Sequence, residues 1–208
     1  MGDRKYTEAD IRIVEIDEHV RANPAMRFGA ARGNPGLATR VPAEVLSHVL
    51  HPAARLAPLH TLRAEAEVLG DLVFSIRDDR PDALDERGLP REGYCGSLLG
   101  PDRWIAAAAA ALCARTLVEV WRDGHGLRQE LAGIRPAEEP RRFDAPTGAG
   151  TRLVFELDET HFGPGAVIAG DLTGLDLHGP YCAEPPGPGH VGLRDLRGPG
   201  EPVVIRHR

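Results

Sequence analysis

The sequence has little of what binding to nucleic acid or to a membrane requires. Its 25 Lys and Arg residues are outnumbered by 31 Asp and Glu residues, the formal net charge is -6, and Lys5 is the single lysine. Nucleic-acid binding draws its affinity from clustered basic side chains, so no direct nucleic-acid contact is expected. No apolar run approaches the roughly eighteen residues of a membrane span, and the first ten residues are charged rather than signal-like, which predicts a cytoplasmic protein.

Cysteine is also scarce, with three scattered residues that lack metal-ligand spacing: Cys95, Cys113 and Cys182. This pattern favours free or buried thiols over a disulfide framework. Apolar residues, by contrast, make up 42% of the 208 residues, enough for one substantial core. We expect a single domain over residues 1–208, with its core at about 8–162 and a part rich in Pro and Gly at 163–208. The abundance of Ala, Arg, Gly and Pro is typical of a GC-rich bacterial genome.

Apolar periodicity and turn residues predict helices and hairpins in alternation. Helices are expected at residues 8–21, 41–51 and 104–113. Strands are expected at residues 61–68, 72–76, 117–121, 127–131, 151–157 and 203–205. Residues 79–100 and 136–150 have the composition of loops, and Pro42 is compatible with the second helix only in its first turn, where its missing N–H is not needed. This order predicts an α+β fold in which helices cover a mixed or mostly antiparallel sheet.

Several short motifs follow one another in an order that resembles the order of motifs in the ATPase domain of the gyrase B subunit. Residues 18–29 resemble the family's first helix and its exit, and Glu-Val-Leu-Ser-His at 44–48 resembles the next helix, Glu-Val-Val-Asp-Asn. Ile-Arg-Asp-Asp at 76–79 resembles the strand end before the family's Asp-Asp-Gly-Arg-Gly-Ile-Pro. The segments that resemble the later strands are residues 117–129, 150–155 and 192–195. The resemblance covers most of residues 10–197 and implies the GHKL, or Bergerat, two-layer α/β sandwich.

The resemblance also implies roles for individual residues. Asp78 matches the carboxylate that accepts a hydrogen bond from the adenine amino group, and Thr151 matches the hydroxyl that supports it. Glu44 matches the general base that activates water against the terminal phosphate. Arg128 matches an arginine at the mouth of the family's pocket, where coumarin-type inhibitors bind. The residues for reading a planar ring are therefore retained.

The residues that would handle phosphate and magnesium are replaced. His48 stands where the family has its magnesium-binding Asn, and neutral imidazole is a poor ligand for a hard, oxygen-preferring ion. Arg80, Pro81 and Asp82 stand where Gly-Arg-Gly is expected, which hinders backbone approach to a nucleotide. After Gly100, where the family has further glycines opening a helix, Asp102 and Trp104 oppose an anion by charge and by bulk. ATP hydrolysis and topoisomerase activity are therefore not expected.

Glu44, His48 and His51 lie at helical offsets of four and three, which places them on one helix face. Two imidazoles and a carboxylate suit a transition metal such as Zn²⁺ or Fe²⁺. The same residues also suit acid–base chemistry, with Glu44 orienting a His48 ring that transfers protons. A polar helix face wetted by solvent is a third interpretation, and the sequence alone leaves all three open.

Three functions are compatible with these residues. The first is a repurposed pocket that binds a planar heterocyclic or natural-product-like small molecule, with Asp78, Thr151, Arg128, His51 and Trp104 as ligand-binding residues. The second is a cyclase, dehydratase or isomerase of specialised metabolism that uses Glu44, His48 and Asp78 as catalytic groups. The third is a pseudo-ATPase interaction module that binds ATP weakly. No cofactor is expected, ATP with Mg²⁺ is the weaker alternative, and a protein partner or a homodimer is left open.

Overall fold

The structure is a computed structural model that describes residues 14–50, 63–170, 190–199 and 203–207. Its strands are β1 (Arg63–Gly70), β2 (Val73–Asp78), β3 (Cys113–Arg122), β4 (His125–Ala132), β5 (Arg135–Pro136), β6 (Arg141–Asp144), β7 (Ala149–Leu157), β8 (His190–Asp195) and β9 (Val203–His207). Its helices are α1 (Ile16–Ala22), α2 (Ala25–Phe28), α3 (Leu37–Leu50), α4 (Trp104–Ala111) and α5 (Glu159–Phe162), with a 3₁₀ turn, η2, at Tyr94–Gly96.

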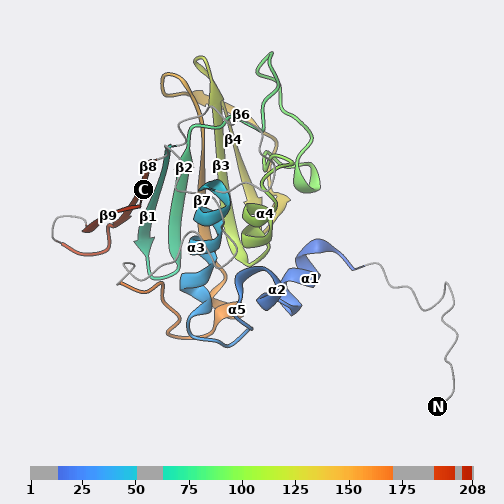
Figure 1. Ribbon diagram of the computed structural model, residues 1–208. Coiled ribbons are helices and arrows are strands. Elements are labelled where there is room, and N and C mark those ends of the chain that lie inside the picture. The colour runs from blue at the N-terminus through green and yellow to red at the C-terminus, as the bar shows by residue number, and fades with distance from the viewer. Residues whose placement is uncertain (1–13, 51–62, 171–189, 200–202, 208) are drawn as a thin grey trace, which may run out of the picture.

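The strands form one open sheet. Eight of them follow the order β5-β4-β3-β7-β2-β1-β8-β9, and β6 pairs with β4 beside β5. β1 and β8 pair in parallel, whereas the other described pairs are antiparallel. Figure 1 shows α1, α3 and α4 on the same face of this sheet. The predicted α+β class, with helices over a mixed and mostly antiparallel sheet, is confirmed.

The alanine-rich helix α4 lies at the centre of the helical layer. All of its residues from Ile105 to Ala111 are buried, and it contacts both α1 and α3. Alanine is the best intrinsic helix former, and its small side chain allows neighbouring elements to approach closely. The prediction of a buried helix here is confirmed, but it ends at Ala111, because Cys113 already begins β3.

The second predicted helix begins earlier than the sequence suggested. α3 starts at Leu37 rather than near residue 41, so Pro42 lies inside the helix and not in its first turn. Proline there removes one helical hydrogen bond and clashes with the preceding turn. The burial of Leu37, Val41 and Val45 on one side of the helix offsets this cost. The part of the first predicted helix before residue 14, and His51 at the end of the second, lie outside the described residues.

The segment predicted as a polar loop at residues 136–150 contains a strand. β6 pairs with β4 through residues 141–144, and the neighbouring β5 also pairs with β4. Gly126 of β4 has no side chain, and a Cβ built there would lie 2.6 Å from the Phe143 ring, so the glycine makes room for β6. The short, charged Arg-Arg-Phe-Asp sequence of β6 offers little alternation, which is why periodicity did not identify it.

The opposite face of the sheet carries a network of charged side chains. Arg115 pairs with Glu130 and Glu156 at 2.8 and 2.7 Å, and Arg194 pairs with Glu67 at 2.7 Å. Arg128 pairs with Glu119. These residues alternate along their strands with apolar residues that face the helices, as expected for a half-buried antiparallel sheet.

Among the described residues, no helix combines the length and the apolar character that crossing a membrane requires. Cys95 is exposed and Cys113 is buried, and both are free thiols, as predicted. Cys182 lies outside the described residues.

Candidate functional site

The two residues that the resemblance assigns to ring recognition lie side by side. Asp78 ends β2 and Thr151 lies directly opposite it on β7. Both side chains face the helical layer, and Asp78 is 4% exposed and Thr151 1% exposed. The antiparallel register of β2 and β7 therefore brings the two side chains together on one face of the sheet.

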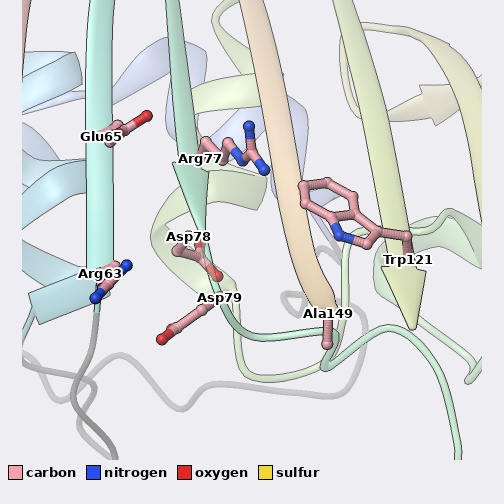
Figure 2. Close-up of a pocket in the computed structure, with 7 residues that line it drawn as sticks. All are labelled: Arg63, Glu65, Arg77, Asp78, Asp79, Trp121 and Ala149. Carbon is pink, nitrogen blue, oxygen red and sulfur yellow. The ribbon is translucent and has the colours of Figure 1, made fainter. Parts of the chain in front are cut away.

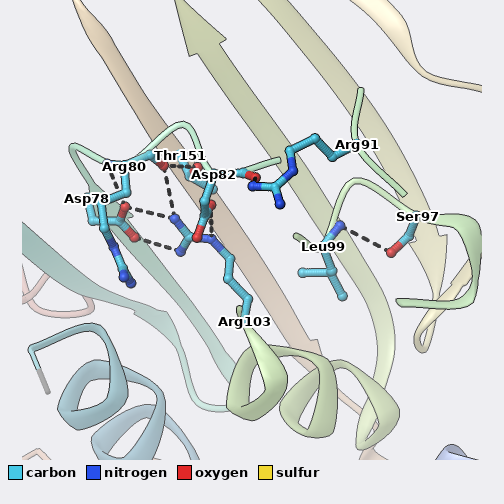
Figure 3. Close-up of polar contacts among 8 residues, drawn as sticks. All are labelled: Asp78, Arg80, Asp82, Arg91, Ser97, Leu99, Arg103 and Thr151. Atoms are coloured by element: carbon cyan, nitrogen blue, oxygen red, sulfur yellow. Dashed lines mark hydrogen bonds and ion pairs between the residues drawn. The ribbon is translucent and has the colours of Figure 1, made fainter. Parts of the chain in front are cut away.

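Arg103 occupies the space in front of Asp78. Its Nη1 and Nη2 atoms donate to Asp78 Oδ2 and Oδ1 at 2.7 and 2.8 Å, and its Nε donates to Asp82 Oδ1 at 2.7 Å (Figure 3). Arg103 is 2% exposed, and its side chain enters from the residue just before α4. Burial opposes the charge on the guanidinium, but the carboxylates of Asp78 and Asp82 outweigh burial and raise the pKa of Arg103. The planar, bidentate geometry is the strongest form of arginine–carboxylate contact.

The backbone of Arg80 forms the other hydrogen bonds around Asp78, Thr151 and Arg103. Its backbone N–H donates to Asp78 Oδ1 at 3.0 Å, and its carbonyl accepts from Thr151 Oγ1 at 2.6 Å and from Arg103 Nη2 at 3.0 Å. A carboxylate has about four lone-pair sites. Three of those on Asp78 are therefore engaged by the chain itself, and the Thr151 hydroxyl donates internally as well.

Glu44 and His48 lie on α3, one turn apart. Burial raises the pKa of Glu44, with Arg40 opposing the shift. Burial also lowers the pKa of His48 to about 4, helped by the positive charges of Arg80 and Arg103 against the opposing carboxylates of the loop. His48 is therefore neutral near pH 7, when it can accept a proton or a hydrogen bond.

Trp104, the first residue of α4, covers His48. The two rings meet edge to face with centroids 5.1 Å apart, and the Arg27 guanidinium lies 5.2 Å from the centroid of the Trp104 ring. Trp104 is only partly buried. Its side chain therefore connects the surface residue Arg27 with the more interior ring of His48. The Trp104 and His48 rings thus lie between α3 and the start of α4.

Several buried polar atoms in this region have no hydrogen-bond partner. They are His48 Nε2, Arg80 Nε and Nη2, and Asp82 Oδ2. His48 is close enough to Arg80 and Asp82 for their charges to shift its pKa, so the atoms belong to one neighbourhood. Figure 3 shows the Arg80 side chain extending away from the Asp78 and Arg103 contact. A buried polar group without a partner costs about 1–3 kcal/mol, so partners supplied from outside would stabilise this region.

The neutral state of His48 predicts a pH-dependent stability. Its pKa is about 4 in the fold and about 6.5 in the unfolded chain, so the unfolded state binds more protons between these values. The contribution of neutral His48 to the free energy of unfolding is fully present above pH 6.5 and is lost as the pH falls toward 4. We expect wild type to lose about 1 kcal/mol more than His48→Phe between pH 7 and pH 5, allowing for partial exposure. Urea unfolding at both pH values measures this, and an equal loss in both proteins would contradict it.

Arg128 is not brought to this site. The register from β2 through β7 and β3 to β4 places Leu127 on the face of Asp78, so Arg128 lies on the opposite face. There it pairs with Glu119 and lies over the Phe143 ring, 5.2 Å from its centroid. Arg128 therefore cannot contact a ligand bound beside Asp78 on the helical face.

The sequence analysis did not single out Arg103. It weighed Asp102 and Trp104 as obstacles to an anion after Gly100, but not the arginine between them. The sequence did contain a signal for this residue. Arg103 is a basic residue at the start of an apolar, alanine-rich helix, and it follows a loop rich in aspartate. A buried helix start with one arginine requires a carboxylate partner, because buried charges are paired.

No three His, Cys, Asp or Glu side chains come together as a metal site in the part of the chain that the structure describes. Glu44 and His48 are within that part, whereas His51 is outside it, so the three-residue metal hypothesis stays a prediction.

No family model and no curated protein sequence matches the chain.

Proposed function

We propose that this protein is a gyrase-B-like GHKL domain that binds a planar, natural-product-like small molecule in place of ATP, without ATP hydrolysis or topoisomerase activity. The observation that carries the proposal is the bidentate contact of Arg103 with Asp78. An adenine amino group would need the same carboxylate oxygens that this guanidinium already holds. Gyrase-like nucleotide binding would therefore require an ion pair in the interior to break, at a cost of several kcal/mol.

The ligand would bind beside Arg103 rather than on Asp78. The unpartnered Arg80 Nε and Nη2 atoms offer donors to a carboxylate or carbonyl edge, and the neutral His48 ring offers a further polar contact. Trp104 offers an apolar ring surface against which a flat ligand packs. Because the His48 Nε2 atom is buried and Trp104 contacts the His48 ring, a ligand would reach it by displacing the partly exposed Trp104 side chain.

A thermal-shift experiment with two probes tests the proposal. We expect coumarin-3-carboxylate, a flat heterocyclic acid, to raise the melting temperature by about 2–4 °C for each kcal/mol of binding, and ATP with Mg²⁺ to leave it unchanged. Arg80→Met should abolish the response to the acid, because it removes the donors without shortening the side chain much.

Arg87→Met is the matched control, since Arg87 is an exposed arginine of the same loop. It should respond as wild type does. Magnesium-dependent stabilisation by ATP, or an Arg80→Met protein that still responds to the acid, would count against the proposal.

A second candidate function is acid–base catalysis at the same place. It is favoured by the position of Glu44 and His48 one turn apart on α3, where burial raises the pKa of the carboxyl and lowers the pKa of the imidazole. Pairs of groups whose pKa values are displaced by their surroundings often divide acid and base roles. Mass spectrometry of the ligand after incubation distinguishes the two functions, because an enzyme converts the ligand whereas a binding protein returns it intact.

A further inference from the structure

A cavity of about 580 Å³ lies on the face of the sheet opposite the helices. Figure 2 shows it at the ends of β1, β2, β3 and β7. Its lining residues are Arg63, Glu65, Arg77, Asp78, Asp79, Trp121 and Ala149. The Asp78 side chain faces the helices and is held by Arg103, so this cavity is separate from the site proposed above.

The floor of the cavity is the Trp121 indole. Trp121 of β3 pairs with Gly150 of β7, and a Cβ built on Gly150 would lie 2.7 Å from the indole Cζ2. The missing side chain at position 150 therefore lets the ring lie across β7 toward β2. There the Arg77 guanidinium covers it, 5.1 Å from the ring centroid, as a cation–π contact. This contact stabilises both groups.

Charges of both signs alternate around this floor. Glu65 and Arg77 face each other across β1 and β2, while Arg63 and Asp79 line the cavity at the strand ends. Within the described part of the chain, no ion pair within 4 Å joins Arg63 or Arg77 to a carboxylate. The rest of this sheet face differs, because its arginines are paired with glutamates. The cavity thus keeps two guanidinium groups available for an outside anion.

Two buried polar atoms at the cavity also lack partners. Trp121 is 2% exposed, and its Nε1 donor has no acceptor. Figure 2 shows this nitrogen on the edge of the ring that faces the Ala149 end of the cavity. Asp79 Oδ1, an acceptor, is also without a donor. Glu65 also lines the cavity, but it pairs with Arg194 at 3.6 Å. The site therefore has one neutral donor and two cations for an acceptor group, and Asp79 as the unpaired carboxylate for a cationic donor.

We propose that this cavity binds a small dipolar ion of the α-amino acid type. Its carboxylate is held by Arg77 and Arg63, with the Trp121 N–H as an additional donor after a small shift of the ring. Its ammonium group is held chiefly by Asp79, because Glu65 already pairs with Arg194. A ligand with one charge alone would leave either the two guanidinium groups or Asp79 without a partner, so the site favours the dipolar form over either singly charged relative.

Isothermal titration calorimetry with three probes that share a phenylethyl skeleton tests this inference. L-Phenylalanine carries both charges, 3-phenylpropionate carries only the carboxylate, and phenethylamine carries only the ammonium group. The twenty common L-amino acids, each at about 10 mM, then define the side-chain preference. We expect at least one amino acid to bind, and its deaminated and decarboxylated relatives to bind about tenfold or more weakly, because each lacks a charge-assisted hydrogen bond.

Arg77→Met and Asp79→Asn should each weaken amino acid binding about tenfold or more. Methionine keeps an apolar contact on the Trp121 ring, so Arg77→Met tests charge rather than packing. Arg141→Met, an exposed arginine on β6 away from the cavity, is the control and should bind as wild type does. Circular dichroism checks that each variant is folded. Absence of binding by every amino acid, equal binding of the singly charged probes, or unchanged binding in Arg77→Met would each overturn the inference.

Discussion

Replacement of Arg103 by alanine is expected to lower the free energy of unfolding by about 3–5 kcal/mol, the usual cost of removing one partner of a buried ion pair. Arg103 is 2% exposed and donates to Asp78, Asp82 and the Arg80 carbonyl. Its loss leaves the Asp78 charge in the interior without a partner and creates a cavity at the start of α4. Urea unfolding at pH 7 measures the effect.

Arg115→Ala is the matched control for this experiment. Arg115 also pairs with two carboxylates, Glu130 and Glu156, at 2.8 and 2.7 Å, but its side chain is 42% exposed. Exposed ion pairs contribute only about 0–1 kcal/mol, because solvent screens them and ordering long side chains costs entropy. The same number of salt bridges should therefore give very different losses of stability. Equal losses for the two variants would show that burial is not what makes Arg103 important.

The cavity left by Arg103→Ala should accept a guanidinium ion from solution. Methylguanidine at low millimolar concentration is expected to raise the stability of Arg103→Ala by about 1.4 kcal/mol at ten times its dissociation constant, and to leave wild type unchanged. Asp78→Asn in the Arg103→Ala background should remove this rescue, since it removes the negative charge. A rescue that is independent of Asp78 would mean that the ion binds elsewhere.

Gly150→Ala is expected to destabilise the fold by about 3 kcal/mol, at the upper end of the usual cost of overpacking. A Cβ at this position would lie 2.5 Å from the Asp78 carbonyl oxygen and 2.7 Å from the Trp121 ring. The carbonyl belongs to a paired strand and cannot move away without breaking the contact of β2 with β7. The substitution therefore disturbs both the Trp121 floor of the cavity on the sheet face opposite the helices and the end of β2 at Asp78. Thermal unfolding followed by circular dichroism measures it.

Two further variants separate the causes of that effect. Gly198→Ala is the control, because nothing lies within 4 Å of a Cβ built there, and its stability should stay within about 0.5 kcal/mol of wild type. Trp121→Leu combined with Gly150→Ala removes the clash with the ring but leaves the clash with the carbonyl. The double variant should therefore recover only part of the loss attributed to Gly150→Ala. Full recovery would assign the whole effect to the indole.

The strands and the Ala-rich helix could be predicted because their signals are local. Apolar runs beside turn residues identified β1, β2, β3 and β4, alternation identified β7, and the Ala-rich run identified α4. The start of α3 could not be placed, because Pro42 is tolerated within the helix through burial of its neighbours, which is a tertiary effect. β6 was missed because its four residues have no alternation and depend on pairing with β4.

At the candidate site, the sequence by itself placed Asp78 at the end of one strand and Thr151 at the start of another, whereas the match of His48 to a magnesium-binding side chain stays a prediction. These features follow from motifs a few residues long. The placement of Arg103 on Asp78, of Trp121 over Gly150 and of Arg128 on the other sheet face was decided only by the tertiary structure. The physical reason is that such contacts depend on strand register and on the path of a long loop, and a shift of one residue moves a side chain to the opposite face.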